Sequence, residues 1–370
     1  MQFLLNTMQP VLMICIKSSI FYKPVETSCI FFKKSNLNHL PTTSSQDILF
    51  QRIKEILPQH ISLVDAISEV LHVSSDSAYR RIRGETPLVL EEAKTLCHHY
   101  NLSLDQLLEA KKGVILFRDY RLNNHQYDYR QYLQGLNEQL EAVNNFMQKE
   151  IIYMSKDLPI FHNFYYRPLI AFRYYFWMKT HLMHPDFEKK QFHFDLLPTD
   201  IEQMSFDLTK TYSRIPSTEM WNTESINSTI SQIEFSKDSG HFQSSADIKI
   251  IYEALEETIY HMQQQAEYGC KFTPGEDPQG RKSNFKFFFN RVVLGDNTIM
   301  VITDFVKAAF INYGHLNYIT TSDESFCKEL YSDFENLIRR STQISQSSEK
   351  QRNIFFNIIL SKIGDRKRNL

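Results

Sequence analysis

The sequence predicts a mainly α-helical protein with two folded parts: a five-helix N-terminal domain, and a larger α+β domain with a small antiparallel β-meander. Three observations lead to this prediction. A chain of 370 residues suits two domains better than one. Apolar residues recur at helical spacing through most of the chain. Residues 282–321 instead concentrate Phe and β-branched residues around turn residues, which is typical of antiparallel strands.

The N-terminal segment, residues 1–45, lies outside both predicted domains. Its apolar start, MQFLLNTMQPVLMICI, has no preceding Lys or Arg, is interrupted by Gln9 and Pro10, and is too short to span a bilayer. No later segment approaches a membrane-spanning length. We therefore expect residues 1–45 to be disordered or an upstream extension, and we expect no membrane partner.

Charge and cysteine usage favour a cytoplasmic protein. The chain carries 41 Lys and Arg against 43 Asp and Glu, and such a balance is compatible with a small basic patch. The five cysteines lie far apart, without metal-ligand spacing or a disulfide framework. They suit a reducing compartment, in which buried thiols act as small hydrophobic side chains.

Residues 46–112 contain five short helical stretches, each with one apolar face. The second begins at the capping residue Ser62. The third, residues 75–83, follows a three-residue turn and ends before Gly84. Two more helices follow, the last of them capped at Ser103. No single helix of this length could bury its apolar face alone, so the five must pack into one domain.

The helix at residues 75–83 has a polar, cationic outer surface. On a helical wheel, Ser75, Ala78 and Ile82 point toward the core. The remaining side chains point outward, flank that outer face or lie at the edge of the core face: Asp76, Ser77, Tyr79, Arg80, Arg81 and Arg83.

A helix of this kind fits the major groove of double-stranded DNA, which admits one helix whose N-terminal side chains contact base edges. A guanidinium group matches two acceptors of guanine at once. Hydroxyl and guanidinium groups nearby suit phosphates. The residues expected to contact bases are Ser75, Asp76, Ser77, Arg80 and Arg81. The candidates for contacts to the DNA backbone are Ser62, Tyr79 and Arg83.

The stretch LVDAISEVLHVSSDSAYRRIRGETPLVLEEAKTLCHHYNLSLDQLL resembles the helix-turn-helix domain of lambda-repressor-like transcriptional regulators of the xenobiotic-response-element type. It is also similar to Bacteroidetes regulators that join such a domain to a long C-terminal region. The resemblance covers about 65 residues and implies a DNA-binding regulator. The matching residues are Val73, Ser74, Gly84, Leu96, Leu102, Ser103, Leu104, Asp105 and Leu108.

Three positions depart from the pattern of that family. Ser68 replaces the usual Ala, His72 replaces the Gly of the turn, and Arg81 stands where an apolar residue is common. A residue other than Gly at the turn is expected to need a positive φ, at a cost of roughly 1 kcal/mol. Ile82 is expected to take the apolar role of Arg81.

An alternative interpretation of the arginines is a solvated helix face with ion pairs to Glu85 or Asp76. Residues 46–112 hold eight Lys and Arg against ten Asp and Glu, so one domain alone would bind DNA weakly. Two domains held one helical turn apart on the duplex would bind specifically. We therefore expect a homodimer.

Residues 114–370 form the predicted C-terminal α+β region for dimerisation or effector sensing. A helix expected from about Tyr127 to Ser155 spaces its apolar residues alternately by four and three, as a coiled-coil seam does. The same spacing also suits an amphipathic helix packed on its own domain. The aromatic segment from Phe161 suits either an apolar ligand pocket or a core helix.

The rest of this region is predicted as two helices, near 223–235 and 245–268, then the meander. Two final helices are expected near 323–342 and 348–363, with Thr321 and Glu324 as a capping pair and a frayed basic tail.

The sequence shows no pattern that argues for an enzyme. GEDPQGRKS, residues 275–283, misses the phosphate-binding P-loop because Arg281 separates Gly280 from Lys282. His181, His184 and His193 lack carboxylate or Cys partners for a metal. We expect no catalytic residues, no metal and no cofactor.

The sequence as a whole predicts a sequence-specific DNA-binding transcriptional regulator, with an effector of unknown kind. Two alternatives stay open: an adaptor or antitoxin-like protein whose helical domain binds another protein, and an enzyme that uses the aromatic segment.

Overall fold

The computed structural model describes most of the chain, in the ranges 44–57, 61–100, 102, 115–120, 129–292, 295–313 and 317–370. Its contacts divide the chain into two compact units that meet between Leu116 and Phe117. We call them the helical unit and the sheet unit. Residues 1–43 of the predicted N-terminal segment and the predicted fifth helix at Ser103 lie outside the described residues.

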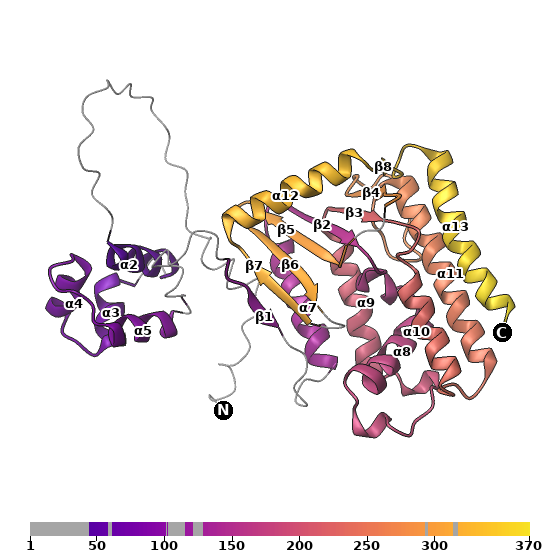
Figure 1. The fold of residues 1–370 in the computed structure, drawn as a ribbon, viewed down its shortest axis with the longest axis horizontal. Coiled ribbons are helices and arrows are strands. Elements are labelled where there is room, and N and C mark those ends of the chain that lie inside the picture. The colour runs from indigo at the N-terminus through magenta and orange to yellow at the C-terminus, as the bar shows by residue number, and fades with distance from the viewer. Residues whose placement is uncertain are drawn as a thin grey trace. The chain divides into compact units, whose positions relative to one another are not determined.

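The described part of the helical unit contains four helices around one apolar core (Figure 1). They are α2 (Ser45–Ile56), α3 (Leu63–Leu71), α4 (Ser75–Ile82) and α5 (Leu90–His99). Each helix contributes to the buried cluster, which consists of Leu49, Phe50, Ile53, Ile67, Ala78, Leu96 and Cys97. The helices are short, so this shared core rather than intrinsic propensity holds them.

Side-chain caps fix where these helices begin. Ser62 caps α3 by accepting a hydrogen bond from the backbone N–H of Val64, as predicted. Ser74 caps α4 in the same way, through the N–H of Ser77. His72, in the turn between the two helices, has φ 53°, so the prediction of a positive φ there is confirmed.

In the described part of the sheet unit, eight strands form one sheet in the order β1-β7-β6-β5-β2-β3-β4-β8. The strands are β1 (Arg118–Tyr120), β2 (Lys149–Ser155), β3 (Ser217–Trp221), β4 (Phe285–Phe289), β5 (Thr298–Thr303), β6 (Lys307–Tyr313), β7 (Asn317–Thr321) and β8 (Thr342–Gln343). Strands β2, β3 and β4 are parallel, with Tyr153 opposite Glu219 and Glu219 opposite Phe287. The other neighbouring pairs are antiparallel.

Helices connect and cover these strands. They are α7 (Tyr129–Asn144), η1 (Ile160–Phe164), α8 (Arg167–Phe176), η2 (Trp177–His181), η3 (Pro185–Phe187), η4 (Phe194–Leu196), α9 (Thr199–Arg214), α10 (Asn227–Asp238), α11 (Ser245–Tyr268), α12 (Glu324–Arg339) and α13 (Glu349–Arg368). Parallel neighbours need crossover connections, and the segments between β2 and β3 and between β3 and β4 supply them.

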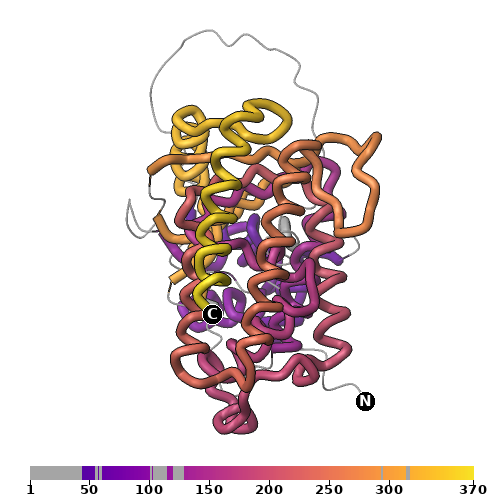
Figure 2. Tube along the Cα trace, turned by 90° about the vertical axis from the view of Figure 1, so that its right-hand side faces the viewer, coloured from indigo at the N-terminus to yellow at the C-terminus, as the bar shows by residue number. Residues whose placement is uncertain are grey.

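The two faces of the sheet have different covers, because successive side chains of a strand point to opposite faces. On one face, Ile152 and Met300 pack with Cys327 and Phe334 of α12. On the other face, Phe287 meets Phe355 and Phe356 of α13, with ring centroids 5.6 and 5.8 Å apart. Helix α13 lies side by side with α11 in both views of the fold (Figures 1 and 2).

The predicted fold class is wrong for this unit. Instead of a small meander appended to helices, an eight-stranded mixed sheet runs through it. The predicted meander is present as β5, β6 and β7, but these are neighbours in a larger sheet. Strand β4, in the same predicted segment, is parallel to β3. The protein is therefore not a mainly α-helical chain with a minor β element.

The predicted long helix from Tyr127 to Ser155 is also wrong. The described helix is α7, which ends at Asn144, and the segment after it forms β2. Its residues Leu133, Leu140 and Val143 are buried within this chain. The heptad spacing therefore reflects packing inside the sheet unit, because buried residues cannot form a seam with a second copy.

Four other predicted helices are confirmed: α11 has the predicted ends, and α10, α12 and α13 have shifted ends. Asp323 caps α12 by accepting from the N–H of Phe326, and Thr321 in turn accepts from the N–H of Asp323. The basic tail continues α13 as far as Arg368 instead of fraying. Among the described helices, none combines the length and apolar character needed to cross a membrane.

Candidate nucleic-acid interface

Helix α4 is held in the helical unit by its underside and its C-terminal end. Ala78 is fully buried and Ile82 packs against the same core. Gln46 of α2 donates to the carbonyls of Arg81 and Thr86 at 2.7 and 2.9 Å, and its Oε1 accepts from the N–H of Leu88. One α2 side chain thus fixes the end of α4 and the turn that follows it.

The exposed face of α4 carries most of the predicted contact residues. Ser75, Asp76, Tyr79, Arg80 and Arg83 are exposed. The prediction that Ser75 faces the core is wrong, because the helix begins at this residue and its side chain lies beyond the packed turn. Ser77 is half-buried, and its hydroxyl bonds to that of the cap Ser74 at 3.0 Å. Ser62 is exposed at the start of α3.

Arg81 is set apart from its two neighbouring arginines. Its guanidinium group makes two bonds to Glu92 of α5, at 3.1 and 2.8 Å, and a third to the carbonyl of Ser77. The Arg81 side chain is only 17% exposed. Arg81 lowers the pKa of Glu92, so this carboxylate stays ionised at neutral pH. The structure therefore places Arg81 between α4 and α5 and not on the outer face where the wheel put it.

Arg80 and Arg83 lie on the surface and share one carboxylate. Their Nε atoms lie 3.9 and 3.3 Å from Glu85, and their side chains are 56% and 58% exposed. Exposed ion pairs of this kind contribute about 0–1 kcal/mol, so either guanidinium group can exchange Glu85 for another anion. Arg83 also lies over the Tyr79 ring, 5.6 Å from its centroid.

Sequence reasoning missed three features of this surface. Gln46 bonds to residues 35 or more positions away, and Glu92 bonds to Arg81, 11 positions away. No local pattern in the sequence signals such contacts. Val89 and Leu90, just before and at the start of α5, are 59% and 69% exposed. These two neighbouring residues form an exposed apolar patch at the N-terminal end of α5.

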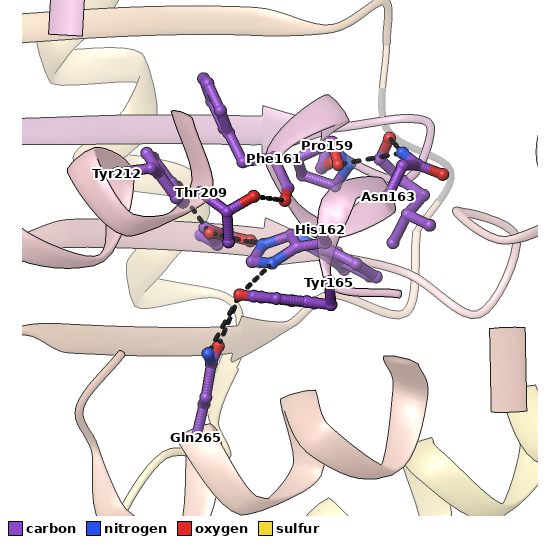
Figure 3. Close-up of polar contacts among 12 residues, drawn as sticks. Pro159, Phe161, His162, Asn163, Tyr165, Thr209, Tyr212 and Gln265 are labelled. Carbon is purple, nitrogen blue, oxygen red and sulfur yellow. Dashed lines mark hydrogen bonds and ion pairs between the residues drawn. The ribbon is translucent and has the colours of Figure 1, made fainter. Parts of the chain in front are cut away.

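The sheet unit contains a second group of polar side chains, which is buried. Glu219 on β3 accepts hydrogen bonds from His162 of η1 at 3.0 Å, Tyr212 of α9 at 2.7 Å and Trp221 at 3.0 Å. His162 and Glu219 are both fully buried. Figure 3 shows His162 with Tyr165 and Gln265 on one side and Tyr212 on the other.

The bonds continue from His162 toward α11. The Tyr165 hydroxyl lies 3.0 Å from His162 Nδ1, and Gln265 donates to that hydroxyl at 3.0 Å. Gln265 also donates to the carbonyl of Phe272, which accepts from His261 Nε2 at 2.8 Å. This buried network ties η1, β3, α9 and α11 together.

Lys271 adds a buried amine to this network. It is 1% exposed, and its Nζ lies 3.6 Å from the centroid of the Tyr212 ring. Nζ has no hydrogen-bond partner among the described residues. Burial lowers the pKa of Lys271 to about 7, although the charge of Glu219 acts to raise it. Burial by itself would raise the pKa of Glu219. The interactions with His162, Tyr212 and Lys271 have a larger and opposite effect, so the pKa of Glu219 is lowered.

The candidates for chemistry singled out in the sequence are dispersed. His184 and His193 accept from nearby backbone N–H groups at the starts of two short helical turns. Residues 275–283 follow the C-terminal end of a helix, α11, whereas a P-loop follows a strand. Within the ranges that the structure describes, no three His, Cys, Asp or Glu side chains are arranged to hold a metal ion.

Comparison with known proteins adds no family to these observations: no family model, no curated protein and no solved structure matches the chain.

Proposed function

We propose that the protein is a sequence-specific DNA-binding transcriptional regulator whose helix α4 enters the major groove. The observation that supports this most is the division of roles along α4. Ala78 and Ile82 anchor one side of the helix, while Asp76 and Arg80 are exposed on the other. A helix held in this way offers rigid side chains to base edges.

The exposed residues divide by the DNA groups that suit them. Arg80 is our candidate for bidentate hydrogen bonds to guanine. Asp76 is our candidate for accepting a hydrogen bond from the amino group of cytosine. Ser75 and Ser77 lie at the N-terminal turn, where side chains contact bases. Ser62, Tyr79 and Arg83 suit phosphate oxygens. Arg81, predicted as a base contact, is better suited to positioning α4 through Glu92.

The remaining parts of the proposal concern assembly and location. One helical unit has few cations for phosphate, so two units must act together for a tight complex. We therefore propose a cytoplasmic homodimer with two half-sites on the duplex. The sheet unit would hold the two copies together or respond to an effector.

The test uses the full chain and a duplex selected from a random pool. Arg80→Ala is expected to weaken binding to the selected duplex by about 5- to 150-fold, because one bidentate base contact contributes about 1–3 kcal/mol. Lys54→Ala is the charge-matched control. Lys54 is exposed on α2, about 12 Å along the helix from Gln46, which contacts the end of α4.

Fluorescence anisotropy at several salt concentrations gives both the dissociation constant and its salt dependence. Binding through phosphates weakens steeply as salt rises. Equal losses in Arg80→Ala and Lys54→Ala would reject α4 as the groove-entering helix. Failure to select any duplex would reject the proposal as a whole.

The apolar patch of Val89 and Leu90 favours a second candidate, a protein-binding helical unit. Side chains as exposed as these mark contact surfaces when they lie together. Leu90→Lys separates the two functions. A protein-binding unit loses its partner with this variant, whereas a DNA-binding unit retains or gains affinity from the added cation.

A further inference from the structure

A pocket of about 260 Å³ lies at the C-terminal end of α11 in the sheet unit. Aromatic rings make up much of its lining: Tyr166, Tyr268, Phe272 and the imidazole of His261. A loop segment that includes Glu276 closes another side. The pocket is independent of the helical unit and of the DNA-binding proposal.

Neighbouring rings around this space lie at steep angles to one another. Tyr268 and Phe272 are nearly perpendicular, at 86°, with centroids 6.3 Å apart. Phe272 and His261 are also nearly perpendicular, at 79° and 4.8 Å. The face of an aromatic ring carries partial negative charge, so rings set at right angles can surround a cation on more than one side.

His261 is a fixed and uncharged part of the lining. Its Nε2 donates to the carbonyl of Phe272 at 2.8 Å, and Gln265 shares the same acceptor. Burial lowers the pKa of His261 to about 4. At neutral pH the ring therefore does not repel a positive ligand.

Glu276 supplies the negative charge. Its Oε2 accepts from the N–H of Thr273 at 2.8 Å and lies 3.1 Å from Arg281. Burial by itself would raise the pKa of Glu276. The contacts with Thr273 and Arg281 have a larger and opposite effect, so this pKa is lowered and the carboxyl group is ionised. Arg281 is part-exposed and competes for this carboxylate, which limits the affinity expected for a ligand cation to the millimolar range.

We propose that this pocket binds a small organic ammonium ion, with Tyr166, Tyr268 and Phe272 around the alkylated nitrogen and Glu276 as the countercharge. Aromatic rings beside a carboxylate favour such a cation over an anion, and over a neutral molecule of the same shape.

Choline and its neutral isostere 3,3-dimethyl-1-butanol test the proposal on the full chain. Saturation-transfer NMR of the methyl groups gives both dissociation constants in one buffer. We expect choline to bind at least tenfold more tightly than the isostere. Glu276→Gln and Tyr268→Leu are each expected to weaken choline binding by about 2- to 30-fold.

Matched controls come from the same helix. Tyr260 and Glu267 are exposed on α11 and do not line the pocket, so Tyr260→Leu and Glu267→Gln should leave choline binding unchanged. Tryptophan fluorescence on thermal unfolding verifies that each variant is folded. Equal binding of choline and the isostere, no choline signal, or equal losses in the control variants would each overturn the proposal.

Discussion

The helical unit and the sheet unit place their charged side chains in opposite ways. Helix α4 holds Arg80 and Arg83 on the surface, beside one exposed carboxylate. The sheet unit encloses Glu219 and Lys271 completely. Exposed charges keep their hydration and remain available to a partner, whereas buried charges must find compensation within the protein. Position in the fold therefore separates charges suited to binding from charges that determine stability.

The largest effect in this comparison is expected from Lys271, whose titration should make the free energy of unfolding depend on pH. The pKa of Lys271 is about 7 in the fold against an ordinary value of 10.5, so the unfolded chain binds more protons between these pH values. The free energy of unfolding of the wild type should rise by about 4–5 kcal/mol from pH 7 to 10.5, relative to Lys271→Met. Below pH 7 the difference should be constant.

Urea unfolding of the full chain across this pH range measures the difference. Both tryptophans, Trp177 and Trp221, belong to the sheet unit, so their fluorescence follows this unit alone. A difference between wild type and Lys271→Met that does not change with pH would show that the amine is hydrated in solution.

Glu219→Gln tests the carboxylate of the same buried network. Its new amide N–H group would face the donors of His162, Tyr212 and Trp221, and the charge opposite Lys271 would be lost. We expect destabilisation by about 3–5 kcal/mol, because the buried donors around Glu219 and the amine of Lys271 would lose the carboxylate that compensates them. Urea unfolding at neutral pH measures it, and Glu335→Gln on the exposed side of α12 should stay within about 0.5 kcal/mol.

Arg81 is an exception to this contrast between the units, because it is a partly buried charge within the helical unit. Arg81→Ala should destabilise this unit by roughly 1–2 kcal/mol through loss of the Glu92 bonds, whereas Arg80→Ala should have almost no effect. Amide hydrogen exchange of residues 75–99 in the full chain measures both. Equal protection in the two variants would mean that Arg81 contributes no more than Arg80 to the stability of the helical unit.

Local patterns were sufficient for the helical unit. Apolar spacing located α2 to α5, and the cap at Ser62 followed from residue type. The left-handed turn at His72 followed from the resemblance to helix-turn-helix domains. Each of these features depends on neighbours a few positions away. The ion pair between Arg81 and Glu92 depends on how α4 packs on α5, and the helical wheel contains no information about that packing.

The sheet unit shows where local patterns fail. Strand β2 continues the apolar sequence of α7, so its spacing was taken for a longer helix. Strand β3, STEMW, has a central Glu and no alternation, yet all five of its residues are buried. Helix α9 was not predicted either. A parallel strand is identified by its neighbours, and these come from segments more than 60 residues apart.

The sequence by itself determined the described helices of the helical unit, the cap at Ser62 and the exposed positions of Arg80 and Arg83, because each depends on residues close along the chain. Only the tertiary structure decided the eight-stranded sheet, the burial of Glu219 with His162 57 residues away, and the pocket at the end of α11. The physical reason is range: hydrogen bonds between strands and the desolvation of buried charges depend on which distant segments meet, and no local spacing encodes that choice.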